Sequence, residues 1–484
     1  MSLGYYFLLP VLFSFLTPYF KKMGVITLRG SSILLNLVLF LQALKYATLD
    51  LPQIAEFSIA PPLGIAFIVD NYSVVFLLLF TFISLLMSFY LLWYFANQKS
   101  QNESRFYIFF NMLTAGTIGL ILSCDIFNVY IFFEIVGISS YALSAFKKDK
   151  LALEAGIKYL IVGSIASLFI VFAIMIIYLQ LGTVNLGQIA QRFHQMDPRI
   201  AALSALMLFI GFGTKAELFP MNFWVPDIYQ GSTSQVAALF SSMVSKAYLF
   251  VFFHLFYLLK LDTNYSSFIM IVAGVTFLVA EFTALNQKDI KRLFAYSTLG
   301  QLGLLFLAFS SGSAGVISGA IFYLVSHSLG KTAIFLSLGI LIDRFKETSL
   351  SIMGRFKSPF LAFVLILSFL SILGIPPFSG FVGKILILKG FAVMHEYKTV
   401  AFILFVSIIE AIYFFRLIFA VTSTKATKES LSIAPINYLV LGILVFLIVL
   451  FGVYPSILTH FSDLAARSLL HPQNYINFAL GVGL

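Results

Sequence analysis

Seven ionisable residues stand inside long apolar stretches of this 484-residue chain. They are Glu134, Lys215, Lys246, His327, Lys331, Lys384 and Glu410. An isolated charge in an apolar layer costs about 2.5 kcal/mol or more. Such a group therefore pairs with an opposite charge or binds a proton. The seven residues predict a path for protons or another small cation.

The order of these residues predicts how they would act together. Lys215 is the expected partner of Glu134, and Lys246 is a second buried lysine in the next apolar stretch. Burial disfavours the charged form of a lysine, and a nearby carboxylate favours it. If the carboxylate of Glu134 came closer to the lysine or moved away, the lysine would therefore take up or release a proton. His327 and Lys331 are four residues apart and share one face of a helix.

A line of alternating donors and acceptors is what a proton relay requires. The alternative for the same residues is a set of static ion pairs, without which a fold would be more stable. Other ionisable residues have a structural interpretation. Glu217, Lys158 and Lys389 lie near expected ends of apolar stretches and would extend to lipid headgroups. Asp227 and Asp289 are interpreted as loop residues.

The elements that must position these residues are membrane-spanning helices. Hydrophobic residues make up 60% of the chain and charged residues 10%, whereas soluble domains are about a quarter charged. The apolar runs are continuous, as in 74–92 and 161–179, which argues against a transmembrane β-barrel. At roughly 20 residues per span, the chain accommodates about 14 helices. We expect an all-α integral membrane protein.

The apolar runs define fourteen expected spans. They lie near residues 5–20, 24–44, 72–95, 106–122, 126–146, 157–180, 200–226, 236–259, 266–286, 293–310, 315–342, 358–390, 400–422 and 436–458. Residues 51–68 are polar or interrupted by proline and predict an extracytoplasmic hairpin. Residues 459–484 predict either an amphipathic surface segment or a frayed terminus. Most loop lysines and arginines fall in the odd-numbered loops, which places both termini outside the cytoplasm.

Two of these spans are interrupted by glycine and proline. The interruptions are at 211–220 in the seventh span and at 374–384 in the twelfth, and each contains a lysine. Paired broken helices at membrane depth point to a transport site, with a proline kink that serves packing alone as the alternative. Because the two spans are five apart, we expect two inverted five-helix repeats. The expected divisions are 1–105, a first repeat at 106–260, a second at 261–424, and 425–484 with the last helix and tail.

The sequence predicts no cofactor, no resident metal ion and no catalytic centre. The single cysteine, Cys124, excludes an internal disulfide, and no Cys/His cluster has metal-ligand spacing. No nucleotide-binding glycine loop is present, so the energy source is expected in another chain. The net charge of +10 follows the positive-inside pattern and does not indicate a nucleic-acid partner.

Several motifs resemble the antiporter-like subunits shared by respiratory complex I, energy-converting membrane-bound hydrogenases and Mrp-type cation/proton antiporters. The motifs are 125–141 with its Phe-Phe-Glu, 213–220 with 224–226, 291–297, and 374–377 through 383–384. Segment 223–240 and the Gly-Phe-Val-Gly-Lys at 380–384 look most like the Mrp D-type subunit and its hydrogenase relatives. One departure is Ser232–Thr233–Ser234, where relatives often have Ala-Pro.

The resemblance implies a role as one proton channel of a multisubunit membrane complex, with other membrane subunits, lipid and protons as partners. It also implies a charge pair of Glu134 with Lys215, a central relay at Lys246, and an exit-side lysine at Lys384. Redox chemistry of the NADH:quinone or hydrogenase type, or an opposing cation gradient, would drive the flow from partner subunits in the cell membrane. The alternatives are a D-type member of a Na+/H+ antiporter without redox partners and a non-conducting scaffold.

Overall fold

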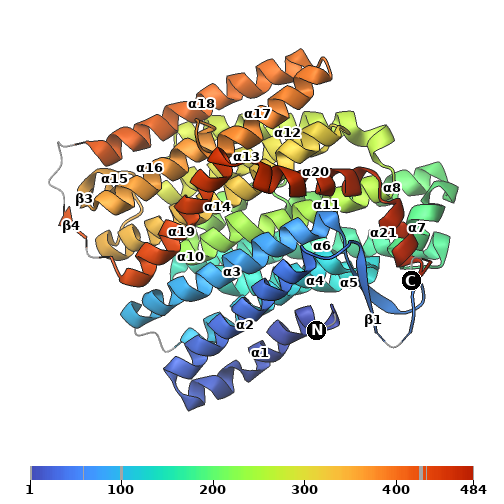
Figure 1. Cartoon of the computed structure of the whole chain (residues 1–484), viewed down its shortest axis with the longest axis horizontal. Coiled ribbons are helices and arrows are strands. Elements are labelled where there is room, and N and C mark those ends of the chain that lie inside the picture. The colour runs from blue at the N-terminus through green and yellow to red at the C-terminus, as the bar shows by residue number, and fades with distance from the viewer. Residues whose placement is uncertain (1–2, 58, 99–101, 424–428, 432, 483–484) are drawn as a thin grey trace.

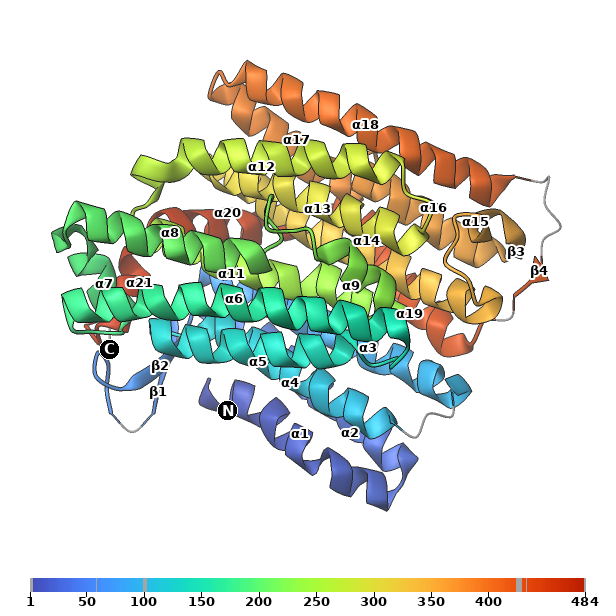
Figure 2. The same ribbon diagram turned by 180° about the vertical axis from the view of Figure 1, so that it is seen from behind.

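The protein is described here from a computed structural model that covers residues 3–57, 59–98, 102–423, 429–431 and 433–482. The helices form one bundle, with α1 along one long edge and α18 along the opposite edge (Figures 1 and 2). Among the described residues, eleven helical segments are long and apolar enough to cross a membrane. They are α2 (Val25–Tyr46), α3 (Asn71–Gln98), α4 (Glu103–Leu122), α5 (Ile126–Ser144), α6 (Lys150–Leu181), the run Ser234–Leu258, α12 (Asp262–Leu285), α13 (Ile290–Phe309), α14 (Ala314–Phe345), α18 (Tyr397–Thr422) and α19 (Pro435–Val453).

The predicted first, seventh and twelfth spans are not among these eleven segments. The first is α1 (Gly4–Met23), a helix that contains two prolines. The seventh divides into α8 (Pro198–Lys215) and the short α9 (Val225–Gly231). The twelfth divides into α16 (Pro359–Leu373) and α17 (Ser379–Val393). The first interruption, at 216–224, overlaps the predicted segment 211–220, and the second, at 374–378, lies within the predicted segment 374–384. The count of fourteen spans stays a prediction.

Shorter elements complete the fold. Strands β1 (Gln53–Phe57) and β2 (Ile65–Val69) form an antiparallel hairpin, which confirms that residues 51–68 are not a further helix. The run Ser234–Leu258 consists of α10 (Ser234–Leu239), a π-helical turn η2 (Phe240–Val244) and α11 (Ser245–Leu258). The sequence did not predict this turn. The remaining short elements are α7 (Leu186–Arg192), η1 (Phe193–Gln195), α15 (Ile352–Arg355), and the parallel pair β3 (Phe356–Lys357) and β4 (Glu429–Ser430).

The C-terminal segment forms two helices, α20 (Ser456–Leu470) and α21 (Gln473–Ala479). Helix α20 packs against α14 and α3, and buries Leu458, Ala465 and Leu469 on one face. Two side-chain hydrogen bonds hold this helix in place. Ser318 Oγ of α14 donates to Asp463 at 2.5 Å, and Ser468 Oγ donates at 2.7 Å to Asp70, the residue before α3. The alternative of a frayed terminus is therefore wrong for the described part of this segment.

The two halves of the bundle repeat one local structure at an offset of 164 residues. Helix α6 begins at Lys150 and α14 at Ala314, and each has 32 residues. Their C-caps, Gly182 and Lys346, both have left-handed backbone. The same offset relates the N-caps Asp125 and Asp289, and the amide bonds from Ile126 to Val184 O (2.9 Å) and from Ile290 to Thr348 O (2.8 Å). This recurrence supports the expected pair of repeats.

Helices α12 and α13 approach closely because Gly303 has no side chain. A Cβ atom at this position would lie 2.5 Å from the Phe277 nitrogen and 2.9 Å from the Ala273 oxygen, both of them backbone atoms that cannot easily move. The substitution Gly303→Ala should therefore cost about 1–3 kcal/mol of stability. The measurement is the midpoint of thermal unfolding in detergent.

Gly442→Ala is the matched control, because no heavy atom lies within 4 Å of a Cβ built at that glycine. Its unfolding midpoint should equal that of the unmodified protein. Equal midpoints for both variants would contradict the close packing of α12 against α13.

Candidate functional site

All seven predicted ionisable residues lie on helices within the two expected repeats. Six of them are buried, and Glu134 on α5 is half-buried. Lys215 ends α8, Lys246 follows the π-helical turn in α11, and the remaining four lie on α14, α17 and α18. Helix α14 contacts α10 of the first half and α13, α16 and α17 of the second, so its His327 and Lys331 stand between the halves. The structure thus brings the predicted residues into one interior.

The ammonium group of Lys215 lies in an aromatic cage. It donates a hydrogen bond to the Tyr141 hydroxyl at 2.7 Å and lies 4.2 Å from the ring centre of Tyr159. Gly163 leaves room for it, since a Cβ there would come within 2.5 Å of Nζ. Such a cage stabilises a cation without neutralising it.

Glu134 does not form the expected direct ion pair with Lys215. No contact within 4.0 Å joins the two side chains, although their charges are close enough to interact. One carboxylate oxygen, Oε1 of Glu134, is buried and has no hydrogen-bond partner in the described part of the chain. The hydroxyl of Tyr141 takes the place next to the ammonium that was predicted for the carboxylate.

The interpretation of Glu217 as a residue that extends to the headgroups is wrong. The residue is 3% exposed, and its Oε2 has no hydrogen-bond partner among the residues that the structure describes. The residue has left-handed backbone (φ 70°) just after α8 ends, which turns it into the bundle. There its charge interacts with Lys246 and Lys331. A carboxylate two residues after Lys215, within the same interrupted segment, was the signal that could have found it.

Lys246 and Lys331 are held by backbone and serine oxygens rather than by carboxylates. The ammonium of Lys246 donates to the Ser241 carbonyl in the π-helical turn and, at 3.3 Å, to Ser245 Oγ. The ammonium of Lys331 donates to the Phe294 carbonyl at 3.1 Å and to Ser297 Oγ at 2.8 Å. Such neutral partners do not balance the charge of the ammonium. A buried lysine without a balancing charge tends to give up its proton, which suits both residues to proton exchange.

His327 occupies the centre of the series. It is fully buried, and neither ring nitrogen has a hydrogen-bond partner among the described residues. The charges of Lys246, Lys331 and Lys384 all act on it. Buried polar groups are nearly always hydrogen-bonded, so an unpaired imidazole is typical of a functional position.

Lys384 and Glu410 form the one fully buried ion pair among the described residues, at 2.6 Å. Lys384 Nζ also lies 3.4 Å from the Leu373 carbonyl, at the end of α16 where the helix is interrupted. Its ammonium stands 5.5 Å from the ring centre of Tyr323. Tyr323 follows Tyr159 by the repeat offset of 164 residues, so each interrupted helix places a lysine over an equivalent tyrosine.

Several further buried ionisable residues were not singled out as candidates from the sequence, among them Glu281 and Lys291. Glu281 on α12 is 0% exposed, and Lys291 at the start of α13 is 1% exposed. Lys291 donates to the carbonyl oxygens of Gln230, at 3.0 Å, and Ser232. Glu281 lies inside the expected span 266–286, so the criterion that selected Glu134 would also have selected it.

Asp227 joins the two halves near the ends of α6 and α13. It lies in the first turn of α9, not in a loop as interpreted, and accepts bonds from Lys158 at 2.8 Å and Arg292 at 2.6 Å. Lys158 is therefore paired at the bundle surface, whereas Lys389 is exposed. Partial burial raises the pKa of the Asp227 carboxyl, but the bonds to Lys158 and Arg292 outweigh this effect and hold the pKa below its usual value.

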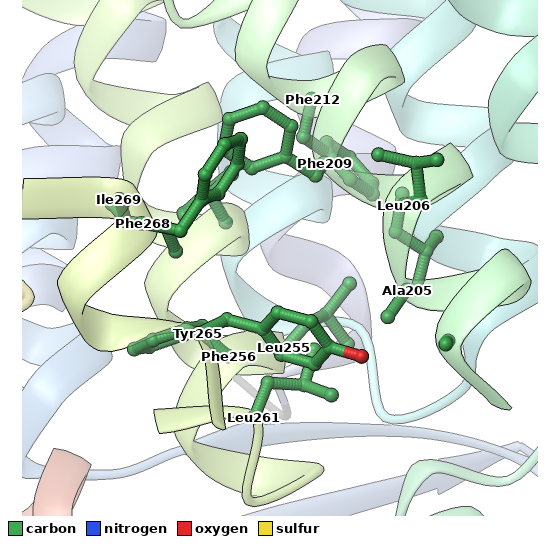
Figure 3. Close-up of a pocket in the computed structure, with 13 residues that line it drawn as sticks. Ala205, Leu206, Phe209, Phe212, Leu255, Phe256, Leu261, Tyr265, Phe268 and Ile269 are labelled. Carbon is green, nitrogen blue, oxygen red and sulfur yellow. The ribbon is translucent and has the colours of Figure 1, made fainter. Parts of the chain in front are cut away.

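An apolar cavity between α8, α11 and α12 is separate from these residues. It has a volume of about 440 Å³ and an apolar lining, in which Tyr265 supplies the single hydroxyl (Figure 3). None of the seven predicted residues lines it, although Phe212 does, one turn before Lys215. Among the described residues, no group of three or more His, Cys, Asp or Glu could hold a metal ion. The ionisable series, not this cavity, is the candidate site.

Comparisons with known proteins agree with this geometry. A family model described as NADH:quinone oxidoreductase/Mrp antiporter, transmembrane, matches residues 123–410. The D-type subunit of the Na+/H+ antiporter of Alkalihalophilus pseudofirmus is 28% identical over 428 residues, which cover 87% of this chain and 86% of that protein. The protein of the same name from Bacillus subtilis is 29% identical over 432 residues, with 87% and 86% covered.

Solved structures match nearly the whole chain. A chain of the membrane-bound sulfane sulfur reductase, an archaeal respiratory membrane complex, superposes with a TM-score of 0.93 at 29% identity, covering 99% of both chains. A chain of the Mrp complex from Dietzia sp. superposes with a TM-score of 0.85 at 20% identity, again covering 99% of both. The second likeness shows the fold alone.

The variant Asp227→Asn should lower the thermal unfolding midpoint at neutral pH, by an amount that corresponds to about 1 kcal/mol or less for a partly exposed pair. The carboxyl pKa is lower in the folded than in the unfolded chain, so its stabilisation is present above the usual aspartate value of about 3.9 and is lost as the pH falls through the folded value. Unfolding midpoints of variant and parent should therefore converge on acidification. A difference that persists or grows at low pH would contradict this assignment.

Proposed function

Because this chain belongs to the NADH:quinone oxidoreductase/Mrp antiporter transmembrane family, we propose that it carries protons through the cell membrane as one subunit of a larger complex. It is a multi-pass, antiporter-like membrane subunit. The observation that carries the proposal is the buried ionisable series from Lys215 on α8 to Glu410 on α18. His327 stands within it, and neither of its ring nitrogens has a hydrogen-bond partner among the described residues.

The relay begins at Glu134 and Lys215. A carboxylate that approaches Lys215 favours the ammonium form, and one that withdraws favours release of the proton. The cage around Lys215 suits this exchange, because Tyr141 and Tyr159 hold the cation without an opposite charge. Glu217, two residues on, is the carboxylate closest in sequence that could accept the proton. Its charge interacts with that of Lys246, so a change in the protonation of Glu217 would alter how strongly Lys246 holds its own proton.

His327 then connects the two halves. Its ring interacts with the charges of Lys246 on one side and of Lys331 and Lys384 on the other. An imidazole can take up a proton at one nitrogen and release another from the second, so it transfers protons without moving far. Lys384 and Glu410 form the far end of the series, where the bond between them must break before the lysine gives up a proton.

Partner subunits would supply the energy. The sulfane sulfur reductase likeness favours a redox-driven complex, whereas the relatives named as D-type subunits of Na+/H+ antiporters favour coupling to an opposing Na+ gradient. We place the repeats at 106–260 and 261–424, with both termini outside the cytoplasm. Mass spectrometry of the complex from native membranes distinguishes the two: iron–sulfur or nickel subunits would indicate redox drive, and small hydrophobic subunits alone an antiporter.

Replacement of the first charged residues tests the relay itself. Lys215→Ala and Glu134→Gln should each abolish proton flux in vesicles that contain the assembled complex, because a general acid–base group typically contributes about 100-fold or more. The exposed Lys389→Ala should leave the flux unchanged. Normal flux in the first two variants would favour the alternative of a non-conducting scaffold.

A further inference from the structure

Glu281 is a fully buried carboxylate that the relay described above does not use. It is 0% exposed on α12 and accepts hydrogen bonds from Gln301 Nε2 at 3.0 Å and from the Tyr413 hydroxyl at 2.8 Å. Gly300 makes room for it, since a Cβ there would lie 2.0 Å from its Oε1. Three helices thus supply a shaped, polar site around one carboxyl group.

A row of buried polar side chains leads from this site to Lys331 of α14. Lys331 Nζ donates to Ser297 Oγ at 2.8 Å, and the Ser297 side chain interacts with that of Tyr413. Tyr413 in turn donates to Glu281. Ser297, Tyr413 and Lys331 are all fully buried, so this row consists of side chains inside the bundle.

The charges of Glu281 and Lys331, at the two ends of this row, also interact. Glu281 interacts with Glu410 and Lys384, which neutralise one another as an ion pair, and with Lys331. The negative charge of Glu281 therefore has Lys331 as the cation left to balance it. A neutral interior is reached either with an ammonium and a carboxylate or with an amine and a carboxylic acid, and these two states differ by one transferred proton.

Glu281, at one end of this row of side chains, lies near the end of its helix. Helix α12 finishes at Leu285, four residues later, which is about 6 Å along the axis at 1.5 Å per residue. The turn from Asn286 to Asp289 follows directly. Neither Lys384 nor Glu410 lies as close to the end of its helix, so Glu281 offers a shorter way out of the bundle.

We propose that Glu281 is a proton-loading site at the end of a branch that runs from Lys331 through Ser297 and Tyr413 to the face with the α12–α13 turn. The ammonium of Lys331 gives a proton to Ser297 Oγ, Ser297 gives its own to the Tyr413 oxygen, and Tyr413 gives its own to Glu281 Oε2. Lys331 becomes an amine and Glu281 a carboxylic acid, while both hydroxyls are regenerated. The inference rests on the proposed proton transport.

The test measures proton flux in proteoliposomes that contain the whole complex, with a pH-sensitive dye inside. Glu281→Gln, Tyr413→Phe and Ser297→Ala each interrupt the branch with little change of volume, and each should reduce the flux by about tenfold or more. Glu281→Asp keeps a carboxyl group and should restore part of it. Tyr90→Phe and Ser310→Ala are matched controls that remove buried hydroxyls bonded to backbone carbonyls elsewhere, and they should leave the flux unchanged.

A second readout separates proton loading from a structural role. Infrared difference spectra of the unmodified complex on acidification should contain a carboxylic-acid band that disappears in Glu281→Gln. Parent-level flux in Glu281→Gln and Tyr413→Phe, with Lys215→Ala inactive, would overturn the branch and leave the relay intact. Parent-level flux in Lys215→Ala as well would overturn the proposed function itself.

Discussion

The cost of an ionised group inside a hydrocarbon layer is the constraint on which the rest of this structure depends. An unpaired charge there is disfavoured by several kcal/mol, so each buried charge needs a specific environment. The protein provides four kinds: an aromatic cage for Lys215, backbone and serine oxygens for Lys246 and Lys331, a carboxylate for Lys384, and hydroxyl and amide donors for Glu281. Groups held in this way can change their protonation state without unfolding the bundle.

The interrupted helices follow from the same constraint. A helix end leaves backbone groups without intrahelical partners, and at membrane depth these must be satisfied by the protein or by a hydrated interior. Lys384 lies close to one such group, the Leu373 carbonyl, and Lys215 is itself the last residue of α8. The repeated offset of 164 residues explains why the arrangement occurs twice. Each time a tyrosine of a 32-residue helix, Tyr159 of α6 or Tyr323 of α14, lies next to the lysine ammonium.

Much of the fold could be predicted from the sequence, because apolar runs, glycine and proline act locally. The spans, the hairpin at 51–68 and both interruptions follow from such patterns. The partner of Lys215 could not be predicted, since Tyr141 and Glu134 stand on one helix and only three-dimensional packing decides which of them reaches the ammonium. Glu217 was misjudged because its distance along the chain from a span end does not reveal the left-handed turn that directs it inward.

In the proposed function, protons cross the bundle through buried lysines rather than around them. Lys246 tests this most directly, because it is fully buried and its charge acts on His327. The measurement is proton flux together with the driving reaction, in the same sealed vesicles, for Lys246→Met in the assembled complex. We expect that flux is lost while the complex remains assembled. Flux equal to that of the parent would contradict it.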